Sequence, residues 1–231
     1  SGIFLKKKNH KFKKYSLDLF ECTNCKLVQI PKAIKSEKMF GSTYEYRTSL
    51  SKLMSTHIKD KAKYLKRKKI VNNNSKILDI GSNDGTFLNN FSNNKYLFGI
   101  DPSALKFKKY YNKNIEIIYD YFSKKNVVKY IKHKINFDLI SSFAMFYDVN
   151  DPNLFCHDIK NLLSNDGVWI LELSYLPLLL KNLSYDQICH EHVTYYSLTV
   201  FKKLIEKNGL QINDYNLNEI NGGSIEIICS K

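Results

Sequence analysis

The stretch Ile77-Leu-Asp-Ile-Gly-Ser-Asn-Asp-Gly85 decides the fold. Its apolar start predicts a buried strand. Gly81 predicts a tight turn where the backbone passes close to a ligand, and Gly85 predicts close packing where a helix begins. The Gly-x-x-x-Gly spacing is not the Gly-x-Gly-x-x-Gly of dinucleotide sites, and no Lys-Ser or Lys-Thr follows as in a phosphate-binding loop. Asp79, ahead of the first glycine, suits a ligand with an amino group.

Apolar runs and amphipathic stretches alternate outward from this turn. The expected strands are 76–80, 96–100, 115–119, 137–142 and 167–173, and 210–217 and 224–229 form a closing antiparallel pair. The expected helices are 85–91, 103–111, 123–132, one starting at Asp151-Pro152, and one from Ser197 to Gly209. A further helix spans 49–70, with one apolar face made of Leu50, Leu53, Met54, Ile58, Ala62 and Leu65. This alternation predicts a Rossmann-like α/β domain, with a mostly parallel seven-stranded sheet flanked by helices.

Two more acids follow strands of the predicted sheet. Asp101 ends the second strand, where ribose hydroxyls lie in such folds, and Asp120 follows the third, within reach of an adenine amine. Each could instead be a turn or cap residue. Together with Gly81 and Gly85 they resemble the class I S-adenosylmethionine (SAM) methyltransferases, over roughly residues 70–175. The resemblance implies a SAM site made of Asp79, Gly81, Asn83, Gly85, Asp101, Asp120 and Ser141.

A second group of polar residues lies in Asn182–Ser197, after the fifth strand. It holds His190, His192, Glu191, an Asp and several Tyr, which is unlike an ordinary solvated loop. A metal site and a hydrogen-bonded loop are alternatives, but helical zinc sites use His at i and i+4. The pattern favours an acid/base cluster, because His is suited to proton transfer near neutral pH.

His190-Glu-His192 followed by Tyr195-Tyr-Ser197 resembles the Glu-His motif of the sugar C-methyltransferases of deoxysugar biosynthesis. Three other segments are similar to that family: Tyr44-Glu-Tyr-Arg-Thr-Ser49, Cys22-Thr-Asn-Cys25 with the following Lys-Leu-Val-Gln29, and Asn221-Gly-Gly-Ser224. The resemblance implies that His192 is a general base oriented by Glu191. It implies that Tyr46 or Tyr44 donates to an acceptor oxygen, and that Cys22 and Cys25 are half of a zinc site, empty in this chain.

The chain departs from that family in several places. Cys189 stands where relatives carry a Tyr, and Met145-Phe-Tyr-Asp-Val149 stands where they often carry a His. The large C-terminal domain and the first zinc cysteine pair are not in the sequence, so zinc is expected in a longer form only. We expect an appendage at 1–43, the remnant of a zinc-binding module, and a methyltransferase domain at 44–231. O-methylation of a capsule or lipopolysaccharide precursor stays open beside C-methylation.

Composition narrows the acceptor. A net charge of +14 in 231 residues indicates either a solvated surface or a phosphate-bearing partner. We expect a small acceptor, a sugar or nucleotide-linked sugar, rather than RNA, because the basic residues do not alternate with aromatics. The apolar stretch 169–180 is interrupted by Glu172, Ser174 and Pro177, which argues against membrane insertion. Five scattered cysteines and no export signal predict a reducing cytoplasm.

Overall fold

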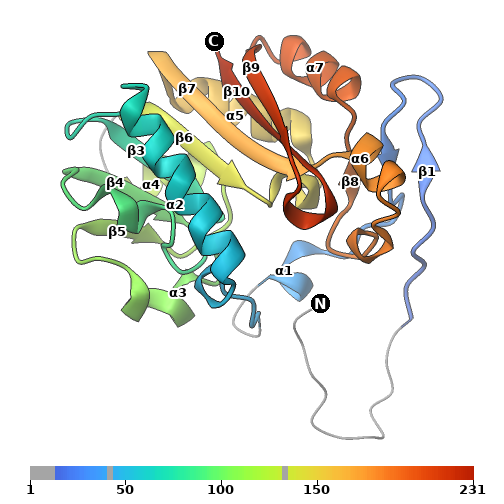
Figure 1. Ribbon diagram of the computed structural model, residues 1–231, viewed down its shortest axis with the longest axis horizontal. Helices are drawn as coiled ribbons and strands as arrows, with labels where there is room; N and C mark the ends of the chain where they lie inside the picture. The colour runs from blue at the N-terminus through green and yellow to red at the C-terminus, as the bar shows by residue number, and fades with distance from the viewer. Residues whose placement is uncertain (1–13, 41–43, 132–134) are drawn as a thin grey trace, which may run out of the picture.

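The computed structural model describes residues 14–40, 44–131 and 135–231. Its centre is a seven-stranded sheet in the order β5-β4-β3-β6-β7-β10-β9 (Figure 1). The strands are β3 (Lys76–Ile80), β4 (Tyr96–Ile100), β5 (Ile115–Ile118), β6 (Phe137–Phe143), β7 (Leu163–Ser174), β9 (Gln211–Asn218) and β10 (Ser224–Ser230). From β5 to β7 all neighbours are parallel, and β10 is antiparallel to both β7 and β9. The predicted fold class is confirmed.

Helices cover both faces of the sheet, as Figure 1 shows with α2 in front and α4 and α5 behind. One face carries α2 (Lys52–Arg67), the 3-10 turn η2 (Leu88–Phe91) and α3 (Ala104–Phe107). The other carries α4 (Lys124–Ile131), α5 (Pro152–Leu162) and α7 (Leu198–Lys207). No helix within the described ranges is both long and apolar enough to span a bilayer.

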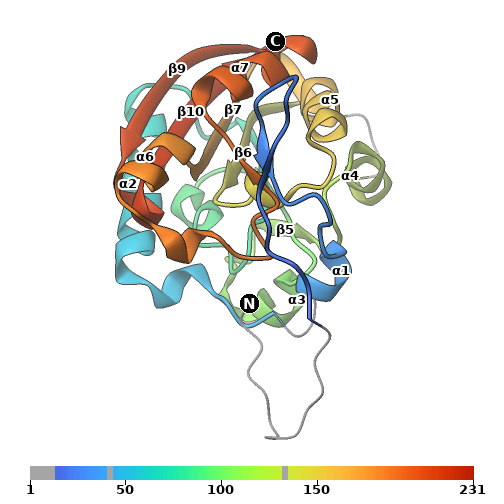
Figure 2. The same ribbon diagram turned by 90° about the vertical axis from the view of Figure 1, so that its right-hand side faces the viewer.

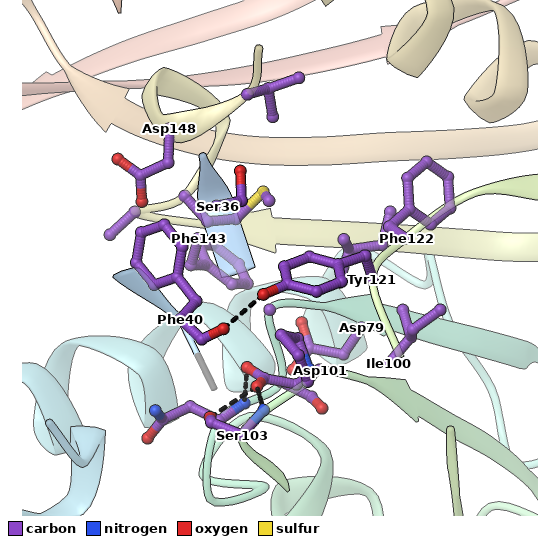
Figure 3. A pocket seen from close by; sticks show the side chains of 18 of the residues that line it. Ser36, Phe40, Asp79, Ile100, Asp101, Ser103, Tyr121, Phe122, Phe143 and Asp148 are labelled. Carbon is purple, nitrogen blue, oxygen red and sulfur yellow. Dashed lines mark hydrogen bonds between the residues drawn. The ribbon is translucent and has the colours of Figure 1, made fainter. Parts of the chain in front are cut away.

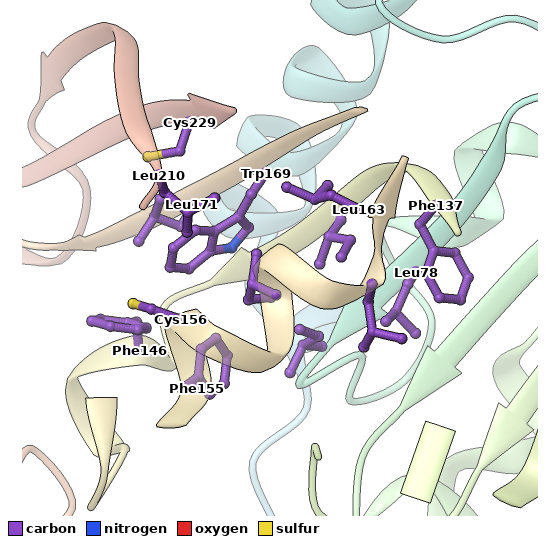
Figure 4. Close-up of a cluster of buried hydrophobic side chains, with 14 of the residues drawn as sticks. Leu78, Phe137, Phe146, Phe155, Cys156, Leu163, Trp169, Leu171, Leu210 and Cys229 are labelled. Atoms are coloured by element: carbon purple, nitrogen blue, oxygen red, sulfur yellow. The ribbon is translucent and has the colours of Figure 1, made fainter. Parts of the chain in front are cut away.

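Successive strand residues point to opposite faces, so each strand supplies two cores. Ile77 packs under α2, whereas its neighbour Leu78 packs under α4 and α5. The core between the sheet and helices α4 and α5 contains an aromatic cluster around Phe146 (Figure 4). The Phe146 ring lies 5.5 Å from that of Trp169 and 5.3 Å from that of Phe155. Phe146 starts the 3-10 turn η4 (Phe146–Asp148), so this core fixes the turn that follows β6.

Two predicted helices are shorter than expected. Residues 85–91 form only η2, from Leu88, and 103–111 divides into α3 and the 3-10 turn η3 (Lys108–Tyr110). The predicted apolar face of α2 is wrong at its start, because Leu50 and Leu53 are 71% and 67% exposed. Ser51 caps the helix by accepting from Met54 N, so Leu50 lies ahead of it in η1 (Thr48–Leu50). Leu53 precedes Met54, the first buried residue of α2, and one residue of an α-helix turns the side chain by about 100°, so Leu53 points away from the buried face.

The segment before residue 44 is attached to the domain through a small second sheet. β1 (Phe20–Glu21) pairs with β2 (Val28–Gln29), and β2 pairs with β8 (Thr194–Tyr195). Figure 2 shows this blue segment crossing the side of the molecule that faces the viewer. The chain continues into α1 (Ser36–Met39), whose residues reach the site described below. The predicted boundary at residue 43 stays a prediction.

Candidate functional site

A cavity of about 420 Å³ opens at the carboxyl ends of β3, β4 and β6. Gly81, Asp101 and Met145, each just past one of these strands, line it, and Figure 3 shows its interior. The order of strands reverses between β3 and β6, and ligands of open α/β sheets bind at such a point. The cavity is therefore the first candidate for a binding site.

The turn after β3 depends on both glycines. Gly81 and Gly85 have φ of +70° and +77°, a backbone conformation that disfavours other residues. A Cβ on Gly85 would lie 2.7 Å from Cδ1 of Tyr111. The Tyr111 hydroxyl in turn donates to the carbonyl of Asn83, at 2.9 Å. Gly85 thus lets Tyr111 approach and hold the turn, in agreement with the predicted close packing, although it does not itself line the cavity.

Asp101 is buried at the end of β4 and is held by three donors. Its carboxylate accepts from Asn83 N at 2.9 Å, and from the backbone N and hydroxyl of Ser103, both at 2.6 Å. Burial raises the pKa of Asp101, and these hydrogen bonds oppose the shift. A carboxylate fixed in this way at the second strand's end fits a pair of ribose hydroxyls. Asp101 and Asn83 both line the cavity, and their predicted contact with the cofactor stays a prediction.

Asp79 lies within β3 and also lines the cavity. It accepts a hydrogen bond from the Ser141 hydroxyl at 2.7 Å, and burial raises its pKa to about 7. A cationic amino group nearby would favour the ionised carboxylate, which fits the amino acid end of SAM. Ser141 supports Asp79 rather than lining the cavity itself.

Asp120, predicted to reach an adenine, does not line the cavity. Its carboxylate instead accepts from the adjacent Tyr121 N at 2.8 Å. Tyr121 lines the cavity in its place and donates to the carbonyl of Phe40 (Figure 3). Phe40 belongs to the segment expected to be an appendage. Sequence reasoning missed both residues, because no spacing pattern links positions so far apart.

The tyrosine-rich segment is fastened to the glycine turn. Asn83 donates to the carbonyl of Tyr46 at 3.1 Å and accepts from Thr48 N at 3.0 Å. This contact places Tyr44 and Tyr46 at the cavity, and both line it. Burial raises the pKa of both hydroxyls, which therefore stay protonated and can donate. Their predicted role as donors stays a prediction, although the structure brings them to the same cavity as Asp101.

The two histidines of the 190–192 loop point in different directions. His190 Nε2 lies 3.2 Å from the carbonyl of Tyr15, whereas His192 packs its ring 4.2 Å from that of Tyr147. His192 Nδ1 lies 2.8 Å from the carbonyl of Gln187, which can only accept, so Nδ1 carries the proton and Nε2 is the basic nitrogen. Neither histidine nor Glu191 lines the cavity; Asp148 does. The predicted roles of His192 and Glu191 stay predictions.

Cys22 and Cys25 lie in the turn between β1 and β2. Backbone hydrogen bonds with Cys25 and Asn24 lower the pKa of Cys22, which favours the metal-binding thiolate. Within the ranges that the structure describes, no cluster of three or more His, Cys, Asp or Glu side chains could hold a metal ion. A structural zinc site needs four ligands, so the two thiols fit half of one.

This half-site leads to a prediction. Metal analysis of the purified chain after dialysis is expected to find far less than one zinc per protein, since two thiolates bind zinc weakly. Cys22→Ser should leave the zinc content unchanged. About one tightly held zinc per chain, lost in Cys22→Ser, would show that the remaining ligands are supplied elsewhere.

A glycine turn, a carboxylate at the next strand's end and a cavity at the carboxyl edge of a parallel sheet define a cofactor-binding α/β domain. A family model described as a methyltransferase domain matches residues 46–214. C-methyltransferase NovU of Streptomyces niveus is 25% identical over 217 residues, which cover 94% of this chain and 51% of NovU. The chain thus spans about half the length of this curated relative.

Solved structures agree on the fold. Magnesium protoporphyrin IX methyltransferase of Synechocystis PCC 6803, solved with bound SAH, superposes with a TM-score of 0.56 at 11% identity, covering 76% of this chain and 82% of that one. The YcgJ protein of Bacillus subtilis gives 0.54 at 15% identity, covering 74% and 98%. The chain belongs to the methyltransferase-domain family. The predicted class, a SAM-dependent methyltransferase enzyme, is confirmed, and SAM is the cofactor of that class.

Proposed function

We propose that this enzyme methylates a sugar or a nucleotide-linked sugar precursor. The observation that carries the proposal is the alignment with a C-methyltransferase along 94% of the chain, which includes the tyrosine segment and the 190–192 loop. The cavity supports it. Asp79 and Asp101 supply a cofactor end, and Tyr44, Tyr46 and Asp148 bring polar groups suited to a hydroxylated or carbonyl-bearing acceptor.

When bound, SAM supplies an electrophilic methyl group that needs a nucleophile in line with it. The residues of this chain would bind and orient around that event. Asp101 and Asp79 would hold the cofactor end, and Tyr44 would donate to an oxygen of the acceptor. His192, with Glu191 beside it in the chain, would supply basicity to the acceptor end. C-methylation requires removal of a proton next to a carbonyl, and O-methylation requires removal of a hydroxyl proton.

O-methylation of a surface-polysaccharide precursor is the second candidate, since a hydroxyl acceptor uses the same polar groups. NMR of the product separates the two, because a C–CH3 group and an O–CH3 group have distinct carbon shifts. A product methylated on oxygen would overturn C-methylation and retain the sugar proposal. Methylation of RNA in preference to every nucleotide sugar would overturn both.

A phosphate on the acceptor would lie outside the cavity. The described residues that line it include the acids Glu37, Asp79, Asp101, Asp148, Asp151 and Asp158, and no Lys, Arg or His. A cationic cofactor suits this lining, whereas a diphosphate does not. The net charge of +14 would attract a phosphate-bearing part that stays outside the cavity.

SAM binding tests the proposal at its cofactor end. Calorimetry is expected to show micromolar binding of SAM or SAH. Asp101→Ala should weaken it by about 1.5–3 kcal/mol for each charged hydrogen bond lost to the ribose. Asp120→Ala is the comparison, and it should weaken binding far less because Asp120 does not line the cavity. No binding of either ligand by the wild type, or equal loss in both variants, would contradict the assignment.

A further inference from the structure

Asp148 is held at the cavity by the core beneath it. It ends η4, directly after Phe146 and Tyr147, which are both buried. Its backbone N donates to the carbonyl of Met145 at 3.0 Å, closing the turn. Figure 3 shows its carboxyl group at the opposite end of the cavity from Asp101. The side chain is thus positioned by rigid neighbours, as a group acting on a ligand needs to be.

The carboxyl group of Asp148 lacks a partner for one of its oxygens. Oδ1 is buried, and within the described residues it has no hydrogen bond. No Lys, Arg or His is found among the described residues lining the cavity. A buried polar atom without a partner is costly, and such atoms in native proteins are usually satisfied by a ligand or water. Asp148 therefore lines the cavity and carries a carboxyl oxygen that no hydrogen bond of the fold uses.

Apart from Glu37, which is exposed, the other cavity acids are already engaged. Asp101 accepts from Asn83 and Ser103, and Asp79 from Ser141. Asp151 caps α5 by accepting from Leu154 N at 3.0 Å, and Asp158 accepts from Lys124 N at 2.8 Å. Each has a structural donor, whereas Oδ1 of Asp148 has none. This difference distinguishes Asp148 from the acids that hold the fold and the cofactor end.

The ionisable groups around Asp148 come from three segments. Burial raises its pKa well above the usual value; a protonated His192 opposes the shift, and Glu191 and Cys189 add to it. The negative charge of Asp148 also contributes to raising the pKa of three tyrosines, Tyr44, Tyr147 and Tyr195. A carboxyl group with a raised pKa is a stronger base than an exposed one, and a positive charge on a neighbouring imidazole would favour its ionised form.

We propose that Asp148 is the catalytic residue that contacts the acceptor and takes its proton, with His192, packed against the adjacent Tyr147, as the positioning residue. The inference rests on the proposed methyltransferase function and assigns its acceptor site. The acceptor's O–H or C–H bond breaks, its proton goes to the Asp148 carboxylate, and its electron pair forms the bond to the methyl group. The pair of the broken C–S bond stays on the sulfur, so the sulfonium becomes a neutral thioether.

Stability against pH tests Asp148 without an acceptor. The folded-state pKa lies above the unfolded value of about 3.9, so the wild type loses stability as pH rises from that value through the folded pKa. Asp148→Asn keeps the shape and removes this loss. Its melting temperature should exceed that of the wild type by about 3–5 °C at pH 8 for each tenfold gain in the folding equilibrium. The difference should vanish near pH 4. If the difference in melting temperature between the two proteins does not change with pH, the proposal that Asp148 is an unpartnered buried carboxylate is wrong.

Turnover tests the catalytic role, with the nucleotide-linked sugar that the wild type methylates. Asp148→Asn should lower the rate by roughly 10²–10⁴-fold, leave SAH affinity within about twofold, and remove the rise of rate with pH. Asp151→Asn is the matched control, because Asn also caps a helix and the same cavity loses one charge. It should keep that rise at the same pH. A normal rate in Asp148→Asn, or an equal change in both variants, overturns the proposal.

The two proposals fail differently. If the wild type methylates no nucleotide sugar but binds SAH, the proposed acceptor class fails, and the stability curves still decide whether Asp148 is an unpartnered buried acid. If the wild type methylates a sugar and Asp148→Asn does so equally well, the function stands and Asp148 is only a lining residue.

Discussion

His192→Ala is expected to lower the methyl-transfer rate by roughly 10²–10⁴-fold if the imidazole itself takes the proton, the usual contribution of a general base, and by less if it only positions Asp148. SAH affinity should stay within about twofold, because the proposed cofactor end contains Asp79 and Asp101 and His192 does not line the cavity. The imidazole packs against Tyr147, next to Asp148 in the chain, and its charge lowers the pKa of Asp148. Its loss should therefore raise that pKa and leave less carboxylate to act as the base.

The pH–rate profile of His192→Ala shows how the imidazole acts. If it works through Asp148, the rise of rate with pH remains and moves to higher pH. If the imidazole is itself the base, the rise disappears. His190→Ala is the control, since that ring faces Tyr15, and it should cost far less. Glu191→Gln should cost less than His192→Ala. An inactive His190→Ala beside an active His192→Ala would assign the role to the other ring.

Gly85→Ala is expected to destabilise the fold by about 2–5 kcal/mol and to abolish measurable SAH binding. A left-handed residue with a Cβ costs about 1–2 kcal/mol, and the clash with Tyr111 adds about 1–3 kcal/mol of overpacking. Displacing Tyr111 also breaks its bond to the Asn83 carbonyl, so the cofactor turn loses its support. Denaturant unfolding and calorimetry measure the two effects.

Gly209→Ala is the control that separates backbone strain at a glycine with positive φ from the displacement of Tyr111 beside the cavity. Gly209 also has positive φ, at +68°, but its Cβ would meet only the flexible end of Lys160. The variant should cost about 1–2 kcal/mol of stability and leave SAH binding intact. Equal loss of binding in both variants would mean that the turn at Gly85 is disturbed by global destabilisation rather than by Tyr111.

Strands were predictable where local pattern and burial agree. β3 and β4 have the expected bounds, since each is a short buried run ending at a turn signal. Asp151 was recognised as the cap of α5 for the same local reason. The helix expected from residue 85 failed, because the cofactor turn and the packing of Tyr111 decide its backbone, and neither is visible as periodicity.

The cofactor end of the site was more predictable than the acceptor end. Asp79, Gly81, Asn83 and Asp101 line the cavity because their places at strand ends follow from the fold. Asp120 also follows a strand and yet does not line the cavity. Its carboxylate accepts a hydrogen bond from the backbone N of Tyr121, and the spacing of residues in the sequence does not reveal such a local contact. Phe40 and Asp148 depend on contacts between distant segments, which only the folded chain brings together.

The position of β10 bears on how the enzyme is made. Among the described residues β9 has only β10 as a neighbour in the sheet, yet β10 follows it in the chain and lies between β9 and β7. During translation the nascent chain therefore carries β7 and β9 before the strand that joins them has left the ribosome. Ile225 and Ile227 of β10 complete the core beside Trp169. A nascent chain that stops before residue 224 would expose the open edge of β7, which is prone to aggregation. A chaperone would have to cover that edge until β10 is made.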